Sequence, residues 1–175
     1  MFSPEHVLRA YFHAKDENRP LLLDRVFAED ALLEVHDASG AIRFPARTLG
    51  REAIADVLVR SFNRQYENIY SFYLERPRAE VDAFDCPWIV VMTEKDGRGV
   101  RVGCGRYEWT FAATAPPLAC RLVIRIAAME VLDAPTTQQV YAAIARLAYP
   151  WSSRGEVMAA LQPLAGTAPA LQALH

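Results

Sequence analysis

Apolar residues in the first part of the chain recur at the spacing of helices. Ser3-Pro4-Glu5 opens the first of these segments with residues that suit a helix start. A single apolar stripe then follows, made of Val7, Leu8, Tyr11 and Phe12. The pattern predicts a first helix from about residue 3, a short helix after Pro20 and a third helix after Gly50.

Between the second and third of these helices, residues 30–37 alternate like a strand with one buried face. Ala31, Leu33 and Val35 point one way, whereas Glu34 and His36 point the other way. The residues that follow, Asp37-Ala38-Ser39-Gly40, have the composition of a turn.

From residue 68 onward, apolar residues alternate over longer segments. Four strands are predicted, at 68–76, 87–95, 100–112 and 119–132. Two glycines in the turn at 95–99 suit a hairpin, and two prolines turn the chain before the last strand. Successive long strands with short connections predict an antiparallel meander.

Helical patterns return after Asp133. Thr136 and Ser153 each stand three residues before a Gln or Glu, which is the spacing of a capping box. The sequence therefore predicts an α+β fold. Its N-terminal helices cover a curved antiparallel sheet around an apolar pocket, and residues 134–175 add a C-terminal helical extension.

Composition narrows the class of protein. Hydrophobic residues make up 52% of the 175 residues and charged residues 23%, which suffices for one folded domain and excludes wholesale disorder. The formal net charge of -2 provides no basic excess for nucleic acid. No segment has the pattern of a signal peptide or the roughly 20 apolar residues of a membrane helix. We therefore expect a cytoplasmic protein with no nucleic-acid and no membrane partner.

Cysteines and histidines show no pattern of metal ligands. Cys86, Cys104 and Cys120 fall in apolar, strand-like segments without a CxxC spacing, so we expect reduced thiols that behave as small hydrophobes. The histidines and acids also lack ligand spacing. We predict no metal site and no cofactor. Motifs of serine hydrolases, P-loop proteins and zinc proteases are absent from the sequence as well.

Three short strings lie in an order that is typical of a known superfamily: Phe27-Ala28-Glu29-Asp30-Ala31, Gly50-Arg51-Glu52-Ala53-Ile54 and Gly105-Arg106-Tyr107-Glu108-Trp109-Thr110-Phe111. With the order of helices and strands around them, residues 3–133 resemble the nuclear transport factor 2 superfamily, which includes ketosteroid isomerase, scytalone dehydratase and SnoaL-like polyketide cyclases. The resemblance implies a domain over 1–133, a sheet curled into a cone over a pocket, and homodimers formed through the outer face of the sheet.

Two residues are candidates for catalysis. Asp37 shares the parity of Leu33 and Val35, and a carboxylate at an apolar mouth can shuttle a proton. The alternative is that Asp37 belongs to the turn after the strand. Tyr11 lies on the buried helical stripe, in a place similar to that of the oxyanion-binding tyrosine of ketosteroid isomerase, and its hydroxyl can donate to an oxyanion. The alternative is an ordinary core aromatic.

Aromatic and aliphatic residues on the inward faces are expected to line the pocket: Phe12, Phe27, Leu33, Val35, Phe62, Tyr70, Tyr107 and Trp109. The strand at 100–112 has an aromatic face, which suits the pocket wall, and a mixed face with Arg106 and Glu108, which we expect to pair across strands or chains. The reverse orientation stays open. Arg125 is expected to pair with a carboxylate of the sheet, for which Glu94 and Glu130 are candidates.

His36 and His13 are expected near the surface, and a His13–Asp37 pair would need the first helix to roll inward. Three functions remain. The first is a pocket that binds a small apolar molecule without catalysis, and the second is an isomerase, dehydratase or cyclase that uses pocket acid/base chemistry. The third is a non-catalytic assembly module, in which the sheet face or the helical tail docks a partner.

Overall fold

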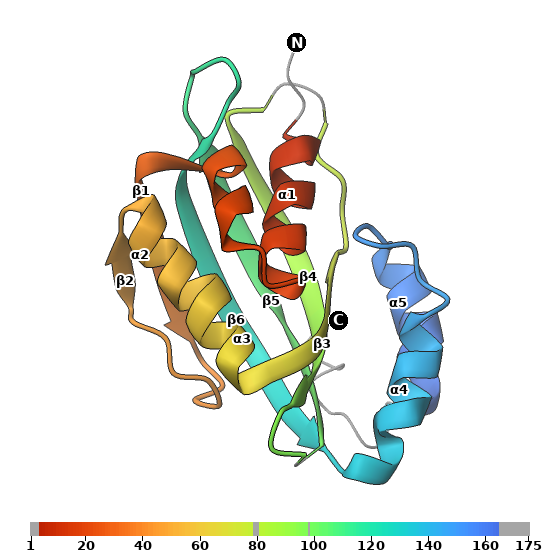
Figure 1. Ribbon diagram of the computed structural model, residues 1–175. Coiled ribbons are helices and arrows are strands. Elements are labelled where there is room, and N and C mark those ends of the chain that lie inside the picture. The colour runs from red at the N-terminus through yellow and green to blue at the C-terminus, as the bar shows by residue number, and fades with distance from the viewer. Residues whose placement is uncertain (1–3, 79–80, 98, 165–175) are drawn as a thin grey trace.

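The computed structural model describes residues 4–78, 81–97 and 99–164, which form a six-stranded sheet with helices on both faces (Figure 1). The elements are α1 (Glu5–Asp16), η1 (Pro20–Arg25), β1 (Phe27–Asp37), β2 (Arg47–Leu49), α2 (Arg51–Ala55), η2 (Asp56–Ser61), α3 (Phe62–Gln65), β3 (Tyr66–Tyr73), β4 (Ala83–Glu94), β5 (Val100–Phe111), β6 (Ala119–Leu132), η3 (Ala134–Thr136), α4 (Thr137–Ile144), α5 (Arg154–Leu161) and η4 (Gln162–Leu164).

The strands lie in the order β2-β1-β6-β5-β4-β3, and β3 to β6 form the predicted antiparallel meander. One part of the prediction is wrong, because β1 pairs with β6 in parallel. Between β1 and β6 the chain passes through β2, the helical run 51–65 and the strands β3 to β5.

Local signals predict some element boundaries and miss others. The capping box at Ser153 is confirmed, because Ser153 Oγ accepts from the Glu156 N–H and the Glu156 carboxylate accepts from the Ser153 N–H. The second expected box is wrong, because Thr136 Oγ1 donates instead to the carbonyl of Asp133 at 2.6 Å. Residues 42–46 form no strand; the short strand begins at Arg47.

The inner face of the sheet packs under the N-terminal helices. Figure 1 shows α1 and the continuous helical run 51–65 lying across this face. Tyr107, Trp109 and Phe111 of β5 point into this core, which confirms the aromatic face as the inner one. Trp88 and Ile124, from the strands on either side, join them. The inner core is therefore dominated by large rings that fill the space between sheet and helices.

The outer face of the sheet carries a second apolar core. It collects alternate residues of β3, β4 and β5, among them Phe72, Ile89 and Val102, and packs them against α4 and α5 through Val140 and Val157. Helices α4 and α5 therefore cover one corner of the outer face. The rest of that face carries cross-strand ion pairs such as Arg106–Asp85 and Arg121–Glu34, together with apolar residues such as Leu49.

The structure also bears on the cysteines, on membrane-spanning helices and on metal ligands. Cys86 and Cys104 are buried, Cys120 is half-buried, and none of the three is in a disulfide. Burial raises the pKa of the Cys86 thiol to about 12. No helix among residues 4–78, 81–97 and 99–164 is long and apolar enough to cross a membrane. The same residues contain no cluster of three or more His, Cys, Asp or Glu that could hold a metal ion.

Gly105 permits a close approach between β5 and β6. The register between these strands shifts at Cys104 and Gly105, and a Cβ on Gly105 would lie 1.8 Å from the carbonyl oxygen of Arg125. The neighbouring backbone cannot move without breaking the ladder, so only glycine fits here. A Cβ on Gly155, at the exposed start of α5, would meet nothing within 4 Å.

We predict that Gly105→Ala lowers the free energy of unfolding by about 1–3 kcal/mol, because the new methyl group collides with backbone in a packed sheet. Gly155→Ala is the matched control and should raise it by up to about 1 kcal/mol, since alanine favours helix. Urea denaturation followed by circular dichroism measures both. Equal effects of the two substitutions would contradict the close approach at Gly105.

Candidate functional site

An apolar cavity of about 40 Å³ lies between the helices and the inner face of the sheet. Its walls come from α1, η2, α3, β4, β5 and β6, together with the loop after β1. Most of the lining is aliphatic or aromatic, and the polar side chains that reach it are those of Tyr11, Lys15, Trp88 and Tyr107. The cavity lies where the sequence predicts the pocket, but it is small because large rings fill the cone.

Tyr11 brings an unpaired hydroxyl to this cavity. Its side chain is fully buried, packs edge-on against Tyr107 and Trp109, and its hydroxyl has no hydrogen-bond partner among the described residues. Burial raises the pKa of Tyr11 well above that of a free tyrosine, although the nearby Tyr107 hydroxyl lowers it in part. The indole N–H of Trp88 is also buried and unpaired among these residues. The Trp88 donor therefore lies in apolar surroundings without an acceptor, and the Tyr11 hydroxyl has only the hydroxyl of Tyr107 beside it, an arrangement that costs stability unless a bound oxygen accepts from these donors.

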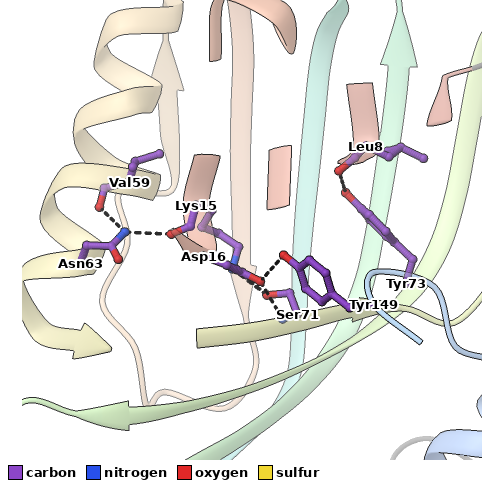
Figure 2. Close-up of polar contacts among 8 residues, drawn as sticks. All are labelled: Leu8, Lys15, Asp16, Val59, Asn63, Ser71, Tyr73 and Tyr149. Carbon is purple, nitrogen blue, oxygen red and sulfur yellow. Dashed lines mark hydrogen bonds and ion pairs between the residues drawn. The ribbon is translucent and has the colours of Figure 1, made fainter. Parts of the chain in front are cut away.

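A buried ion pair closes the side of the cavity at the end of α1 (Figure 2). Lys15 Nζ donates to Asp16 Oδ1 at 2.6 Å and to Ser71 Oγ at 2.7 Å. The Asp16 side chain is only 1% exposed, and it also accepts from the Ser71 N–H, the Ser71 hydroxyl and the Tyr149 hydroxyl. The carboxylate thus has four donors, as a buried charge requires.

The same lysine is in contact with aromatic rings. Its Nζ lies 5.6 Å from the ring centroid of Phe12 and 5.2 Å from that of Phe62, which favours a cation at this point. Asn63 fixes the backbone beside it, because its side-chain amide donates to the carbonyls of Lys15 and Val59 (Figure 2). The ammonium is therefore held at the cavity wall by contacts with α1, α3 and β3.

An open cleft of about 740 Å³ lies outside the cavity, at the mouth of the cone. It runs between the loop after β1, the end of the helical run 51–65 and the β4–β5 turn. Arg101 lies on its wall, where its guanidinium contacts Glu94 Oε1 at 2.5 Å, donates to the carbonyl of Ala41 and lies over the ring of Tyr66. Arg101 is thus fixed in place and its charge is balanced by Glu94.

Ile42, Phe44 and Phe62 line both the cleft and the inner cavity. The rings of Phe44 and Phe62 are stacked with their centroids 6.1 Å apart. These three side chains are the partition between an open cleft and a nearly closed cavity. A change of rotamer at Phe44, which is only partly buried, would join the two spaces.

The expected pocket residues divide into three groups. Phe62 and Tyr107 line the inner cavity, as does Tyr11, which was expected as a catalytic residue. Phe12, Phe27, Leu33, Val35 and Trp109 are buried in the same core but are not part of the cavity lining. Tyr70 is a correction, because it is 45% exposed and contacts Tyr141 and Tyr149 on the outer face. Tyr70 does lie on the same face of β3 as Phe72, but that face packs against the C-terminal helices α4 and α5.

Asp37 lies at the end of β1, and its carboxylate is occupied by the following loop. Oδ1 accepts from the N–H and hydroxyl of Ser39, and Oδ2 accepts from the N–H of Ile42. It is not part of the lining of the inner cavity. The alternative, in which Asp37 belongs to the turn after the strand, accounts for these contacts. Because the turn also holds Ile42, which lines the cleft and the cavity, it shapes the mouth of the site.

The remaining polar candidates lie outside the cavity. His36 is exposed on the outer face, and His13 bonds Glu17 on its own helix rather than Asp37. Arg106 and Glu108 pair across strands as expected, with Asp85 and Arg125. Arg125 does pair with a sheet carboxylate, but the partner is Glu108 on the neighbouring strand β5 rather than Glu94 or Glu130.

The sequence analysis did not single out Lys15 and Asp16, which begin the polar run at the end of the first helix. A signal was present. Lys15 follows Tyr11, and Asp16 follows Phe12, at a spacing of four residues, so both continue the buried stripe of α1. A charged pair on an apolar stripe, in a helix that ends there, is a pattern that predicts a buried ion pair.

No family model and no curated protein matches the sequence. Solved structures do match the fold. An NTF2-like superfamily protein from Salmonella enterica is 12% identical, with a TM-score of 0.56 over 68% of this chain and 84% of that chain. A putative scytalone dehydratase from Novosphingobium aromaticivorans is 15% identical, with a TM-score of 0.56 over 74% and 85%. A protein with a ketosteroid isomerase-like fold from Catenulispora acidiphila, in complex with trimethylamine, is 17% identical, with a TM-score of 0.55 over 70% and 85%.

This chain therefore has the NTF2-like fold, as its resemblance implied. At these identities the likeness extends to the fold alone, and the site has to be judged from its own residues.

The buried pair makes a prediction about stability. Asp16→Asn should lower the free energy of unfolding by about 3 kcal/mol, because it leaves the Lys15 ammonium buried without a counter-ion. The matched control is Asp24→Asn, an exposed carboxylate on η1, which should change it by less than about 0.5 kcal/mol. Chemical denaturation of both variants tests this. A cost for Asp16→Asn as small as that of the control would show that the pair does not hold the fold together.

Proposed function

We propose that this protein binds a small, largely apolar molecule in the cone, with the body of the ligand in the cleft and one end in the inner cavity. The observation that carries this proposal is the Tyr11 hydroxyl, which is fully buried in the wall of an apolar cavity and makes no well-formed hydrogen bond to the described residues, with only the Tyr107 hydroxyl near it. Natural proteins seldom leave such a donor without an acceptor. A ligand oxygen at the inner end would supply one.

The size of the two spaces supports a ligand that spans both. The inner cavity of about 40 Å³ has room for only a water or a small group, whereas a small-molecule site usually encloses roughly 300–1,000 Å³. The cleft of about 740 Å³ falls within that range. Phe44 and Phe62 separate them, so binding would require these rings to part.

The proposal predicts that a cyclic ketone binds more tightly than the hydrocarbon of the same shape. α-Tetralone has a carbonyl oxygen that can accept from Tyr11, and tetralin lacks it. Tyr11→Phe should weaken tetralone binding about five- to tenfold, which is the value of one buried hydrogen bond, and leave tetralin binding unchanged. Quenching of tryptophan fluorescence provides the measurement, since Trp88 lines the cavity.

Tyr73→Phe is the matched control for this experiment. Tyr73 is as buried as Tyr11, but its hydroxyl donates to the carbonyl of Leu8 and it does not line the cavity (Figure 2). It should leave the preference for tetralone intact. If neither compound binds the wild-type protein, or if the two variants behave alike, the proposed role of Tyr11 is wrong.

A second candidate is an isomerase, dehydratase or cyclase of the kind that the resemblance suggests, and Lys15 favours it. Lys15 is the ionisable amine in the cavity wall, with Asp16 as its counter-ion. A lysine in this position can give a proton to a carbonyl oxygen that Tyr11 also contacts and, as the neutral amine, take one from the adjacent carbon. Asp37 is the alternative proton-transfer residue, although its oxygens are held by the loop.

Exchange of the α-hydrogens of tetralone in D₂O, followed by proton NMR, separates these candidates. If Lys15 transfers the proton, Lys15→Met should slow the protein-catalysed exchange at least about 100-fold, while Asp37→Asn leaves it unchanged. Circular dichroism confirms that each variant is folded. The opposite pattern assigns the role to Asp37, and an exchange rate no faster than in buffer shows that the protein binds without catalysis.

We propose a cytoplasmic homodimer formed through the part of the outer sheet face that α4 and α5 leave uncovered. That part carries cross-strand ion pairs such as Arg106–Asp85 and Arg121–Glu34. For an assembly module, the same charges would be the docking surface. The fold favours the pocket as the primary function, because the helices cover the inner face and leave a cleft at its mouth.

A further inference from the structure

Three cations at the mouth of the cone have no ion-pair partner among the described residues. Arg43 comes from the loop after β1, Arg64 from α3 and Lys95 from the β4–β5 turn, and all three are exposed. Each belongs to a different wall of the cleft. Opposed walls that each contribute a positive charge focus a positive potential into the space between them.

The acidic residues of the cleft do not cancel this charge. Four cationic and two acidic side chains line the cleft, which leaves an excess of two positive charges. Glu94 is engaged with Arg101. Asp96 carries an interaction of its own on the β4–β5 turn. The chain as a whole has a net charge of -2, so the charge of the cleft is opposite in sign to that of the protein.

The inner side of the same cleft is apolar. Ile42, Phe44 and Phe62 form it, and the ring of Tyr66 lies beside them. Polarity therefore changes along the depth of the site, from unpaired cations at the rim to hydrocarbon at the partition. A ligand that fits both regions has a hydrophobic body and an anionic end.

We infer that the natural ligand of this site is a small hydrophobic carboxylic acid, bound with its ring or chain against Phe44 and Phe62 and its carboxylate between Arg43, Arg64 and Lys95. This inference rests on the proposed function and adds the charge and orientation of the ligand. Guanidinium groups present planar pairs of donors that match a carboxylate. Arg101 holds the wall in place, and its guanidinium is already engaged by the Glu94 carboxylate and the Ala41 carbonyl.

The test compares two probes of the same shape, naphthalene carboxylate and naphthalene carboxamide, by titration calorimetry on the full chain. The carboxylate should bind about tenfold more tightly, because three exposed charge contacts each contribute a small factor. Its advantage should shrink between about 0.02 M and about 0.5 M salt, since screening weakens exposed charges, whereas amide binding should stay constant.

Two triple variants show which residues cause the preference for the carboxylate. The triple variant Arg43→Gln/Arg64→Gln/Lys95→Gln should bind the two probes equally. The matched control, Arg25→Gln/Arg78→Gln/Arg146→Gln, removes the same charge from exposed positions outside the cleft lining and should keep the preference. All six side chains are exposed, so none of these substitutions should affect folding.

Each outcome decides one of the two proposals. Preference for the carboxylate that only the cleft variant removes supports the inference. Equal binding of acid and amide by the wild-type protein, or equal loss in both triple variants, overturns it while leaving a neutral-ligand pocket in place. If neither probe binds, and tetralone does not bind either, the proposed function itself fails.

Discussion

Asp16 lies at the end of α1, and its carboxylate is the point at which three separate parts of the chain meet. Lys15 approaches from the same helix, Ser71 from strand β3 and Tyr149 from the segment between α4 and α5 (Figure 2). A charge that is 1% exposed can persist only if its donors stay in place. The position of α1 on the sheet, the attachment of the C-terminal extension and the direction of Lys15 therefore depend on one another.

This constraint gives the sheet its two unequal faces. On the inner face, α1 is held close enough for Tyr11 to pack against Tyr107 and Trp109, and the rings fill the cone until only a small cavity remains. On the outer face, Tyr149 anchors the chain between two helices whose apolar sides cover Phe72 and its neighbours. The function that we propose uses the inner face, whereas packing on the outer face stabilises the strands that form the cavity wall.

The sequence predicted much of the fold because the relevant signals were local. The alternation of residues 100–112 predicted a strand and identified its aromatic face. Ser153 predicted the start of a helix, because its capping contacts lie within four residues of it. The parallel pairing of β1 with β6 joins segments about ninety positions apart, and no local pattern specifies it. The orientation of Tyr70 was missed for a related reason, because it depends on which helices cover which face.

The site was predicted only in part, for physical reasons that individual residues make clear. Tyr11 could be singled out because a tyrosine on a buried stripe needs a partner. Lys15 and Asp16 continue that stripe, but whether a charge at a helix end is buried depends on Ser71 and Tyr149, which are distant in sequence. Asp37 had the right strand parity, yet the turn that follows occupies its oxygens. Arg101 became part of a cleft only through the loop after β1, whose Ala41 carbonyl accepts a hydrogen bond from its guanidinium.

The proposed function requires the cavity and the cleft to form a single binding site whose inner end is the Tyr11 hydroxyl. A crystal structure of the protein with bound α-tetralone would show whether they do. The proposal predicts the ketone oxygen within hydrogen-bond distance of Tyr11, the rings of Phe44 and Phe62 moved apart, and the hydrocarbon body extending toward the cleft. A ketone found on the outer face, or in the cleft with Phe44 and Phe62 still stacked and Tyr11 unpaired, would contradict the proposal.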